Sequence, residues 1–312
     1  MQHNIIDRNA MTLDSSTLME TTSHGDVDYP VGVYRVDFSK IHMNFVRWHW
    51  HEETEFALVT EGTGIFYIGD KTFTLSAGQA ILINRAILHS VRMADGCDNL
   101  VVLSIVFSPS IIVGNNNYRL REKFLRPILE SKIECLVLAE STTFNQEMIN
   151  LFLEVFTINR NQTPLYELYT IEFLTQIWIE LLSHHAENME LILSDEDTRP
   201  SIDQSRSKAA ISFIEQHYSE NITLDDIADS IHVSKSECCR CIKRTMGVTP
   251  FEYLMRYRIY IASAKLCNDN GSPSISDLAA SVGFNSSSYF NKLFKKYMNC
   301  TPSQYRKEKM QK

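Results

Sequence analysis

The chain has 312 residues, of which 44% are hydrophobic and 22% are charged, a composition typical of a globular protein large enough for two domains. No apolar run approaches the roughly 20 residues of a membrane span, and the polar segment 1–28 lacks the apolar core of a secretory signal, so we expect no membrane association. Seven cysteines, scattered without paired CxxC motifs, indicate reduced thiols and a cytoplasmic protein.

The net charge of −8 conceals an asymmetry between the two ends of the chain. Residues 207–312 carry 15 Lys and Arg against 10 Asp and Glu, whereas the residues before them carry 15 against 28. This distribution favours nucleic-acid binding by the basic C-terminal part and not by the acidic part that precedes it.

The first two thirds of the chain predict an arm, a barrel and a helical region. Residues 1–30 are polar and predict a loose N-terminal arm. Residues 31–110 contain short β-rich runs such as EFALVT and QAILIN between Gly, Asp and Asn turns, which is typical of a small barrel or sandwich. Residues 194–206 are polar, contain Pro200 and predict a linker. Between barrel and linker, the region 111–193 has apolar residues at helical spacing, at Leu168, Ile171, Leu174, Trp178 and Leu181.

Residues 207–312 are predicted to be helical and to contain an internal repeat. TLDDIADSIHVS (223–234) matches SISDLAASVGFN (274–285), and the segments that follow match at an offset one residue larger. One residue is therefore inserted at the start of the second copy's later helix. Ala228 and Ala279 occupy equivalent positions where two helices must approach closely. This pattern predicts two tandem helix-turn-helix units.

Capping residues predict where these helices begin. A Ser or Thr followed three residues later by an acid can close a capping box, which satisfies free backbone N–H groups at a helix start. The pairs are Thr223 with Asp226, Ser234 with Glu237, and Ser274 with Asp277. Two further pairs add proline at the first helical position, Thr249-Pro250 with Glu252 and Thr301-Pro302 with Gln304.

These C-terminal features resemble the DNA-binding domain of AraC/XylS-type transcription regulators. The resemblance lies in LDDIA, VSKSECCRCIKRTMGVTPFEYLMRYRI and ISDLAASVGFNSSSYFNKLFKKYMNCTPSQYR. It implies that one long helix, roughly Pro250 to Cys267, joins the two units, and that the later helix of each unit lies in the major groove. The matching outward residues are Ser236, Cys239, Arg240, Lys243 and Arg244 in the first unit, and Ser287, Ser288, Lys292, Lys295 and Lys296 in the second.

Two features of the first unit's later helix need separate interpretation. Arg240 is the candidate for a base contact, because arginine can bind guanine O6 and N7 with two hydrogen bonds, and a phosphate contact is its alternative. Lys243, Arg244, Lys295 and Lys296 are expected nearer phosphate. Cys238 and Cys241 occupy the repeat positions of Phe290 and Leu293, which favours small core residues over a metal or redox site.

The barrel segment resembles a cupin. Segment 49–62 matches the family's first motif at every defined position. Segment 78–89 has the spacing of the second motif but not all of its residues, since Asn84 and Ala86 replace its usual Pro and Gly. Strand alternation places the two histidines of the first motif on one face. The four candidate effector-binding residues are His49, His51, Glu55 and His89. Such a set would suit Fe, Mn, Ni or Zn, but in regulators of this kind a small-molecule pocket without metal is favoured.

Together these features predict a multi-domain α+β protein: a cupin-like β-barrel, a helical dimerisation region and an all-α DNA-binding domain. We expect a homodimeric activator or repressor, without enzymatic activity, that binds promoter DNA, contacts RNA polymerase and senses a small molecule such as a sugar or another polar metabolite. No cofactor is expected unless the barrel holds a divalent metal. Two alternatives are a metal-dependent cupin enzyme fused to a DNA-binding domain, and a constitutive DNA-binding protein with a purely structural barrel.

Overall fold

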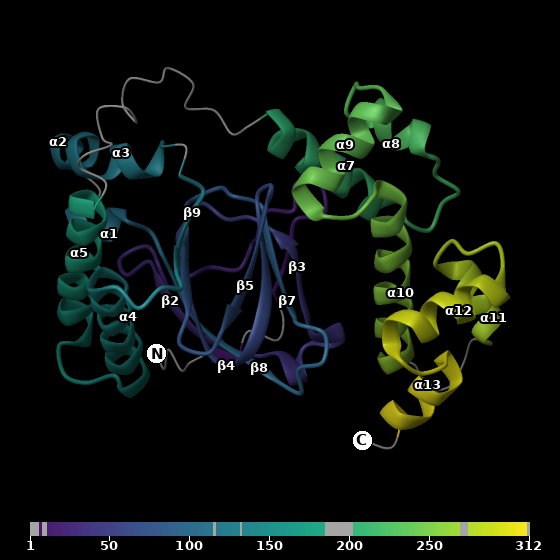
Figure 1. The fold of residues 1–312 in the computed structure, drawn as a ribbon, viewed down its shortest axis with the longest axis horizontal. Helices are drawn as coiled ribbons and strands as arrows, with labels where there is room; N and C mark the ends of the chain where they lie inside the picture. Colours follow the sequence, from purple (N-terminus) through teal and green to yellow (C-terminus); the bar gives the residue numbers. More distant parts are fainter. Residues whose placement is uncertain are drawn as a thin grey trace. The chain divides into compact units, whose positions relative to one another are not determined.

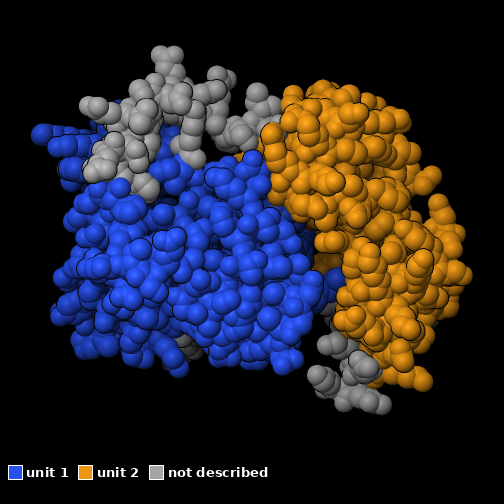
Figure 2. Space-filling view, in the orientation of Figure 1, with its two compact units in different colours: residues 1–14, 19–201 blue, residues 15–18, 202–312 orange. Residues whose placement is uncertain are grey.

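The chain divides into two compact units (Figure 1, Figure 2). The computed structural model describes residues 6–7, 11–114, 117–131, 133–184, 202–268 and 274–310. The first unit comprises residues 1–14 and 19–201, and the second comprises residues 15–18 and 202–312. Among the helices in the described ranges, none has the length and apolar character needed to cross a membrane.

The first unit is built on a nine-stranded sheet. Its main path runs β1-β2-β8-β4-β6-β9, while β5 and β7 pair with β4, and β3 pairs with β7. The strands are β1 (Ile6–Asp7), β2 (Val31–Asp37), β3 (Phe45–His49), β4 (Thr54–Ile68), β5 (Lys71–Ser76), β6 (Ala80–Ile83), β7 (His89–Met93), β8 (Leu100–Phe107) and β9 (Cys135–Leu138).

Strand β4 belongs to both halves of this sheet. Its first half pairs with β6 and β8, and its second half pairs with β5 and β7. The register with β8 shifts between Val59 and Glu61, just before Gly62, whose φ is +74°. A Cβ atom on Gly62 would lie 1.9 Å from the carbonyl oxygen of Asn99. Glycine is therefore required where the strand bends to close the barrel.

Both faces of the sheet are buried along β6, β8 and the first half of β4, which explains the near-continuous apolar runs of these strands. Along β4, Ala57 and Val59 belong to the core inside the barrel, together with Phe66. The alternate residues Phe56 and Leu58 belong to a second core against two long helices, as strand alternation requires. These helices, α4 (Thr143–Asn161) and α5 (Tyr166–His184), follow the short segments α1 (Ser110–Val113), α2 (Tyr118–Leu120), η3 (Arg121–Leu125) and α3 (Arg126–Leu129).

The apolar stripe of α5 packs against the sheet of its own chain. Leu174 and Leu181 are only 1% and 2% exposed and lie in the core between α4, α5 and the sheet. These two leucines are already covered within the chain, so they do not supply the subunit contact expected of a helical dimerisation region. The region expected to be helical also supplies β9, which pairs with β6, and its residues 185–193 lie outside the described residues.

The segment before β2 does not behave as a loose arm. The main-chain N–H of Glu20 donates a 2.8 Å hydrogen bond to the carbonyl oxygen of Trp50, which follows β3. Glu20 and His24 are 4% and 6% exposed. Their polarity suggested solvent exposure, but buried polar groups are stable where they have partners, which the sequence does not reveal.

The second unit is helical outside residues 15–18. Ser212 donates its hydroxyl to the carbonyl oxygen of Ser16 over 2.6 Å, which holds that short segment on the first helix. Two helix-turn-helix pairs, α8–α9 and α11–α12, flank the long helix α10 (Figure 1). The helices are α7 (Ile202–His217), α8 (Leu224–Ser230), α9 (Lys235–Met246), α10 (Pro250–Asn268), α11 (Ile275–Ser281), α12 (Ser287–Met298) and α13 (Pro302–Met310).

The start of α7 shortens the predicted linker. Residues 202–206 form the first turns of α7, so the expected linker over 194–206 extends too far, and residues 194–201 lie outside the described residues. The polar composition of this stretch was misleading because Gln204, although polar, is 2% exposed. A helix can bury such a residue without an apolar signal in the sequence.

The predicted repeat is confirmed in the helices of the second unit. Ala228 and Ala279 are 2% and 1% exposed, and their carbonyl oxygens accept equivalent hydrogen bonds from Val233 N and Phe284 N. The cap of α12 is Ser286, one residue later than the repeat of α8–α9 would place it, as the inserted residue requires.

Most of the predicted caps also form. Reciprocal side-chain and backbone hydrogen bonds close boxes at Thr223 with Asp226, Thr249 with Glu252, and Thr301 with Gln304. At α11, Ser274 accepts from Asp277 N and donates its hydroxyl to the Asp277 carboxylate. At α9, Ser234 accepts from Glu237 N, but the Glu237 side chain turns to two arginines instead. That last box is therefore only half formed.

Candidate DNA-binding surface and barrel cluster

The later helix of the first helix-turn-helix unit is sharply two-sided. Its inner face consists of buried residues, among them Cys238, Cys241 and Ile242. Its outer face carries the five residues expected from the sequence, of which Cys239 is half-buried and the others are exposed: Ser236, Cys239, Arg240, Lys243 and Arg244. The cap at Ser234 and the buried face together fix which side chains point outward.

The later helix of the second unit has the same division. Phe290, Leu293 and Phe294 are buried against the rest of the unit. The five residues expected to face DNA are all exposed: Ser287, Ser288, Lys292, Lys295 and Lys296. The structure thus places both predicted sets on exposed helix faces, while their contact with DNA stays a prediction.

An ion pair restrains Arg240. Its Nε donates to Glu237 Oε2 over 3.0 Å, and a terminal nitrogen donates to Glu237 Oε1 over 2.5 Å. Hydrogen bonding from Arg240 lowers the pKa of Glu237, to which Arg206 from α7 also donates. Because Arg240 is exposed, the pair is weak enough for phosphate or a base to compete. Glu237 could not be recognised as this partner from the sequence, because its spacing from Ser234 indicates a helix cap.

Two cysteines of α9, Cys238 and Cys241, belong to its buried face. Cys238 and Cys241 are fully buried, as predicted, and burial raises the pKa of the Cys238 thiol to about 11. Burial also raises the pKa of Cys241. Thiolates are the reactive and metal-binding form of cysteine, and both shifts disfavour that form.

The barrel brings its four candidate residues together. His49 at the end of β3 is paired directly with His89 at the start of β7. Glu55 on β4 lies with one carboxylate oxygen 3.2 Å from His51 Nε2 and 3.3 Å from His89 Nε2. We call His49, His51, Glu55 and His89 the barrel cluster. None of the four is more than 7% exposed.

Backbone hydrogen bonds fix how the three imidazoles face the cluster. The Nδ1 atoms of His49, His51 and His89 lie 2.8, 3.1 and 2.8 Å from the carbonyl oxygens of residues 47, 53 and 87. A carbonyl oxygen can only accept, so each Nδ1 carries a proton. His51 Nε2 forms a 3.2 Å hydrogen bond with Glu55 Oε2, which needs a proton between the two atoms, and His89 Nε2 lies 3.3 Å from the same oxygen.

This arrangement fits a metal ion of the kind that cupins hold. One ligand atom from each of the four residues lies within 4.8 Å of the others. His89 Nε2 is buried and makes no hydrogen bond among the described residues. Three imidazoles, each with Nδ1 bound to a carbonyl, and one carboxylate form a common donor set for divalent transition metals. A bound ion would supply a positive, Lewis-acidic centre to the barrel.

Three residues beside the barrel cluster were not found from the sequence. Ser104 on β8 donates to the second oxygen of Glu55 over 2.6 Å. Glu20 Oε2 lies 3.8 Å from His49 Nε2 and 3.6 Å from His24 Nε2. Ser104 could have been expected on an inward strand position, but Glu20 and His24 stand in a polar segment with no periodicity.

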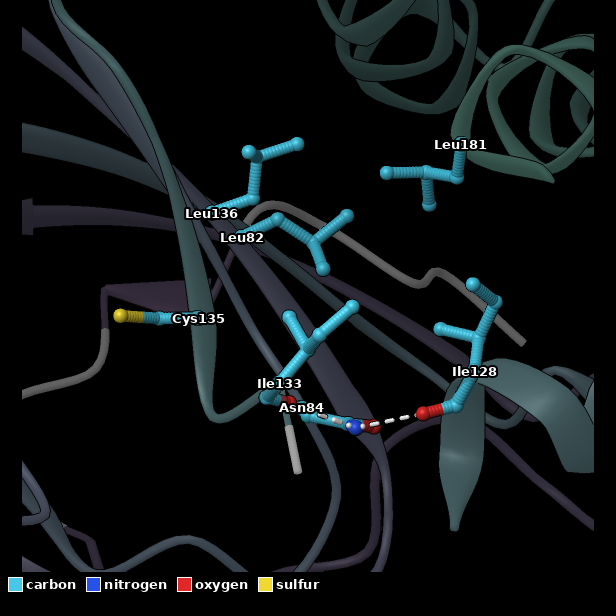
Figure 3. A pocket seen from close by; sticks show the side chains of 7 residues that line it. All are labelled: Leu82, Asn84, Ile128, Ile133, Cys135, Leu136 and Leu181. Atoms are coloured by element: carbon cyan, nitrogen blue, oxygen red, sulfur yellow. Dashed lines mark hydrogen bonds between the residues drawn. The ribbon is translucent and has the colours of Figure 1, made fainter. Parts of the chain in front are cut away.

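A separate pocket lies in the first unit between the sheet, α3 and α5 (Figure 3). Its polar member, Asn84, donates to the carbonyl oxygens of Ile128 and Ile133 and accepts from Arg85 N. Asn84 therefore ties β6 to the α3–β9 connection and has little left to offer a ligand. The remaining lining is Leu82, Ile128, Ile133, Cys135, Leu136 and Leu181, which favours a packing gap over a site for a polar effector.

Comparison with known proteins gives each unit a family. Residues 30–162 match the model of an AraC-like ligand binding domain. Residues 227–308 match the model of a helix-turn-helix domain. A crystal structure of ToxT from Vibrio cholerae with bound unsaturated fatty acid is 16% identical, covers 88% of this chain and 94% of its own, and aligns with a TM-score of 0.37.

Full-length relatives are regulators. The helix-turn-helix transcriptional regulator YdeC of Bacillus subtilis is 29% identical over 98% of this chain and 99% of its own. The lactose operon transcription activator of Staphylococcus xylosus is 25% identical, covering 80% of this chain and 82% of its own. The transcriptional activator RhaS of Escherichia fergusonii is 26% identical, covering 83% and 86%. The chain therefore belongs to the AraC family of transcription regulators, with a ligand-binding domain ahead of a helix-turn-helix DNA-binding domain.

Proposed function

We propose that this regulator binds promoter DNA as a homodimer through α9 and α12, and that an effector held at the barrel cluster sets its affinity for DNA. The observation that carries the proposal is the barrel cluster itself. Four buried polar side chains converge in the domain that matches a ligand-binding family. A protein that only bound DNA would have no need to bury such groups, because apolar residues would fill the barrel more favourably.

The DNA-binding part of the proposal rests on the outer faces of α9 and α12. Each face presents short polar side chains at its beginning and basic side chains toward its end. Short polar and arginine side chains suit base edges, and lysines suit the phosphates on either side of the groove. Arg240 would exchange its hydrogen bonds with Glu237 for hydrogen bonds with DNA.

The effector class is supported by one relative and constrained by geometry. The Staphylococcus xylosus relative is named for the lactose operon, which favours a sugar or another polar metabolite. The hydroxyl groups of such a ligand could exchange hydrogen bonds with the histidines and Glu55. All four cluster residues are at most 7% exposed. A ligand of that size could therefore enter only if the segment around Glu20, which is hydrogen-bonded to Trp50, moved away from the barrel.

Homodimer formation is supported by large apolar side chains of α5 that are exposed in the part of the chain that the structure describes. Leu168 and Ile179 are 64% and 53% exposed and lie three helical turns apart on one side of α5. Leu165, just before α5, is 63% exposed, and Tyr169, next to Leu168, is 45% exposed. Exposed apolar residues gathered on one helix are typical of a subunit contact, and a second copy would present the same residues.

Two further parts of the proposal rest on the relatives. Two of them are named activators, which favours contact between the DNA-bound protein and RNA polymerase, in the cytoplasm where the two would meet. The relatives reported above are named as regulators, which favours a sensor over a metal-dependent enzyme. Consumption of a metabolite by the metal-loaded protein, abolished in His51→Ala, would favour the enzyme instead.

The test is the response of DNA affinity to ligands. A labelled DNA fragment, selected in vitro by the protein itself, is titrated and followed by fluorescence anisotropy, with separate additions of saccharides and of divalent metal salts. The wild type and the control His217→Ala, which removes a half-buried histidine of α7, should respond to one ligand. His51→Ala should bind the fragment but lose the response. A wild type that no ligand affects, and that His51→Ala matches, would support the constitutive alternative.

A further inference from the structure

We propose that residues 19–24, which we call the cover segment, close a divalent transition-metal centre in the barrel, and that Glu20 joins the barrel cluster as a fifth ligand. The inference rests on the proposed function in one respect, because it takes the barrel cluster as the effector site and names the ligand as a metal ion.

The cover segment is held on the barrel by its backbone, and two of its side chains, Glu20 and His24, are buried beside the barrel cluster. Met19 forms a parallel bridge with Trp50, the residue between the first two histidines of the cluster. The N–H of Glu20 donates to the carbonyl oxygen of Trp50 over 2.8 Å. The Glu20 side chain is fully buried, and its Oε2 lies 3.8 Å from His49 Nε2. That separation suits two ligand atoms that each lie about 2.1 Å from one ion.

His24 positions the carboxylate of Glu20. Its Nε2 lies 3.6 Å from Glu20 Oε2, and its Nδ1 lies 2.8 Å from the hydroxyl of Tyr34 on β2. The ring packs edge-on against His51 at a centroid distance of 5.4 Å. His24 Nε2 is buried and makes no hydrogen bond among the described residues. A histidine beside a ligating carboxylate, anchored by a tyrosine, is the kind of outer partner that orients metal ligands.

Charge also favours a divalent ion. Glu20 and Glu55 are two carboxylates, 4% and 7% exposed, that pair here with histidines. A buried carboxylate is costly unless a positive charge compensates it. One divalent cation would balance both carboxylates while the three cluster histidines stay neutral, as their Nδ1–carbonyl hydrogen bonds allow.

The experiment titrates the metal-free full-length protein with Co²⁺, whose visible absorption reports the ligands around the ion. We expect one equivalent to bind. Glu20→Gln, which keeps the shape of the side chain, should weaken Co²⁺ binding by about 10–100-fold and shift the absorption bands. Glu61→Gln, an exposed carboxylate on the same barrel, is the matched control and should leave both unchanged. Circular dichroism checks that each variant is folded.

Hydrogen exchange provides a second readout that does not depend on the spectrum. Co²⁺ should slow amide exchange in the cover segment of the wild type and of Glu61→Gln, but not of Glu20→Gln. A wild type that binds no Co²⁺ overturns the metal centre. Equal affinity, bands and exchange in Glu20→Gln and the wild type overturn the role of Glu20.

Sugar binding separates this inference from the proposed function. A panel of saccharides, lactose included, is tested by thermal shift on the metal-free protein. Stabilisation of the wild type by a saccharide, lost in His51→Ala and without Co²⁺ binding, would refute the metal inference and leave the proposed function standing. Co²⁺ binding that depends on Glu20, with no saccharide effect, supports the metal inference.

Discussion

Replacement of Arg258 by alanine should destabilise the DNA-binding unit selectively. Arg258 stands in the middle of α10 and is 5% exposed. Its guanidinium donates 2.6 Å hydrogen bonds to the carbonyl oxygens of Tyr218 and Glu220, in the connection between α7 and α8. It also lies 5.8 Å from the ring centroid of Phe284, in the turn of the second helix-turn-helix unit. One side chain thus ties both helix-turn-helix units to the helix between them.

The expected loss follows from these contacts. Hydrogen bonds to charged groups contribute about 1.5–3 kcal/mol each, and Arg258 makes two. Tyr218 and Glu220 are partly exposed, so water can replace some of this stabilisation in the variant. We therefore expect Arg258→Ala to lower the free energy of unfolding of this unit by about 2–4 kcal/mol. Arg256→Ala removes an exposed arginine from the same helix and should change it by less than about 0.5 kcal/mol.

Urea denaturation of the full chain distinguishes the two units. All three tryptophans, Trp48, Trp50 and Trp178, belong to the first unit, so their fluorescence follows that unit alone. Hydrogen exchange in α7 and α10 follows the second. Arg258→Ala should accelerate exchange in these helices without moving the fluorescence midpoint. Equal behaviour of the two arginine variants, or a shift of the tryptophan transition, would show that Arg258 does not hold the second unit together.

Three further predictions concern DNA, assembly and acid. Arg240→Ala should weaken binding to a selected sequence by about 1–3 kcal/mol and to random DNA by less, measured by anisotropy; equal losses would indicate a phosphate contact. Leu168→Asp should shift sedimentation from dimer to monomer, whereas Leu174→Asp should destabilise the first unit. Hydrogen bonds from Thr223 lower the pKa of Asp226, so its stabilising effect exists above the unfolded-state pKa and is lost as pH falls through the folded-state value. Melting temperatures of Asp226→Asn should therefore fall less steeply in acid, and an unchanged slope would contradict this.

The DNA-binding unit could be predicted largely from the sequence because its signals are local. A cap such as Thr223 and a small residue such as Ala228 each act within one or two turns of helix. Both features occur again in the second repeat, and two matching copies are not expected by chance. The exception was Glu237, whose carboxylate binds Arg240 instead of the helix start. Two local interactions competed for one side chain, and spacing alone does not show which is stronger.

The ligand-binding unit could be predicted only in part because its decisive contacts are distant in sequence. Helical spacing showed that Leu174 and Leu181 are buried but not whether a sheet of the same chain or another subunit buries them. The motif histidines were found because family spacing marks them. Glu20 and His24 were missed because their partners, His49 and Tyr34, lie on strands that no local pattern connects to a polar segment.

The most direct test of the account is in vitro selection of DNA by the full-length protein and by one variant of each reading helix. Two helix-turn-helix units in tandem predict selected sequences with two conserved elements about one helical turn, 10–10.5 base pairs, apart. Arg240→Ala should erase conservation in one element, and Lys292→Ala should weaken the other. No enriched sequence, or loss of the same element in both variants, would contradict a regulator that reads DNA with α9 and α12.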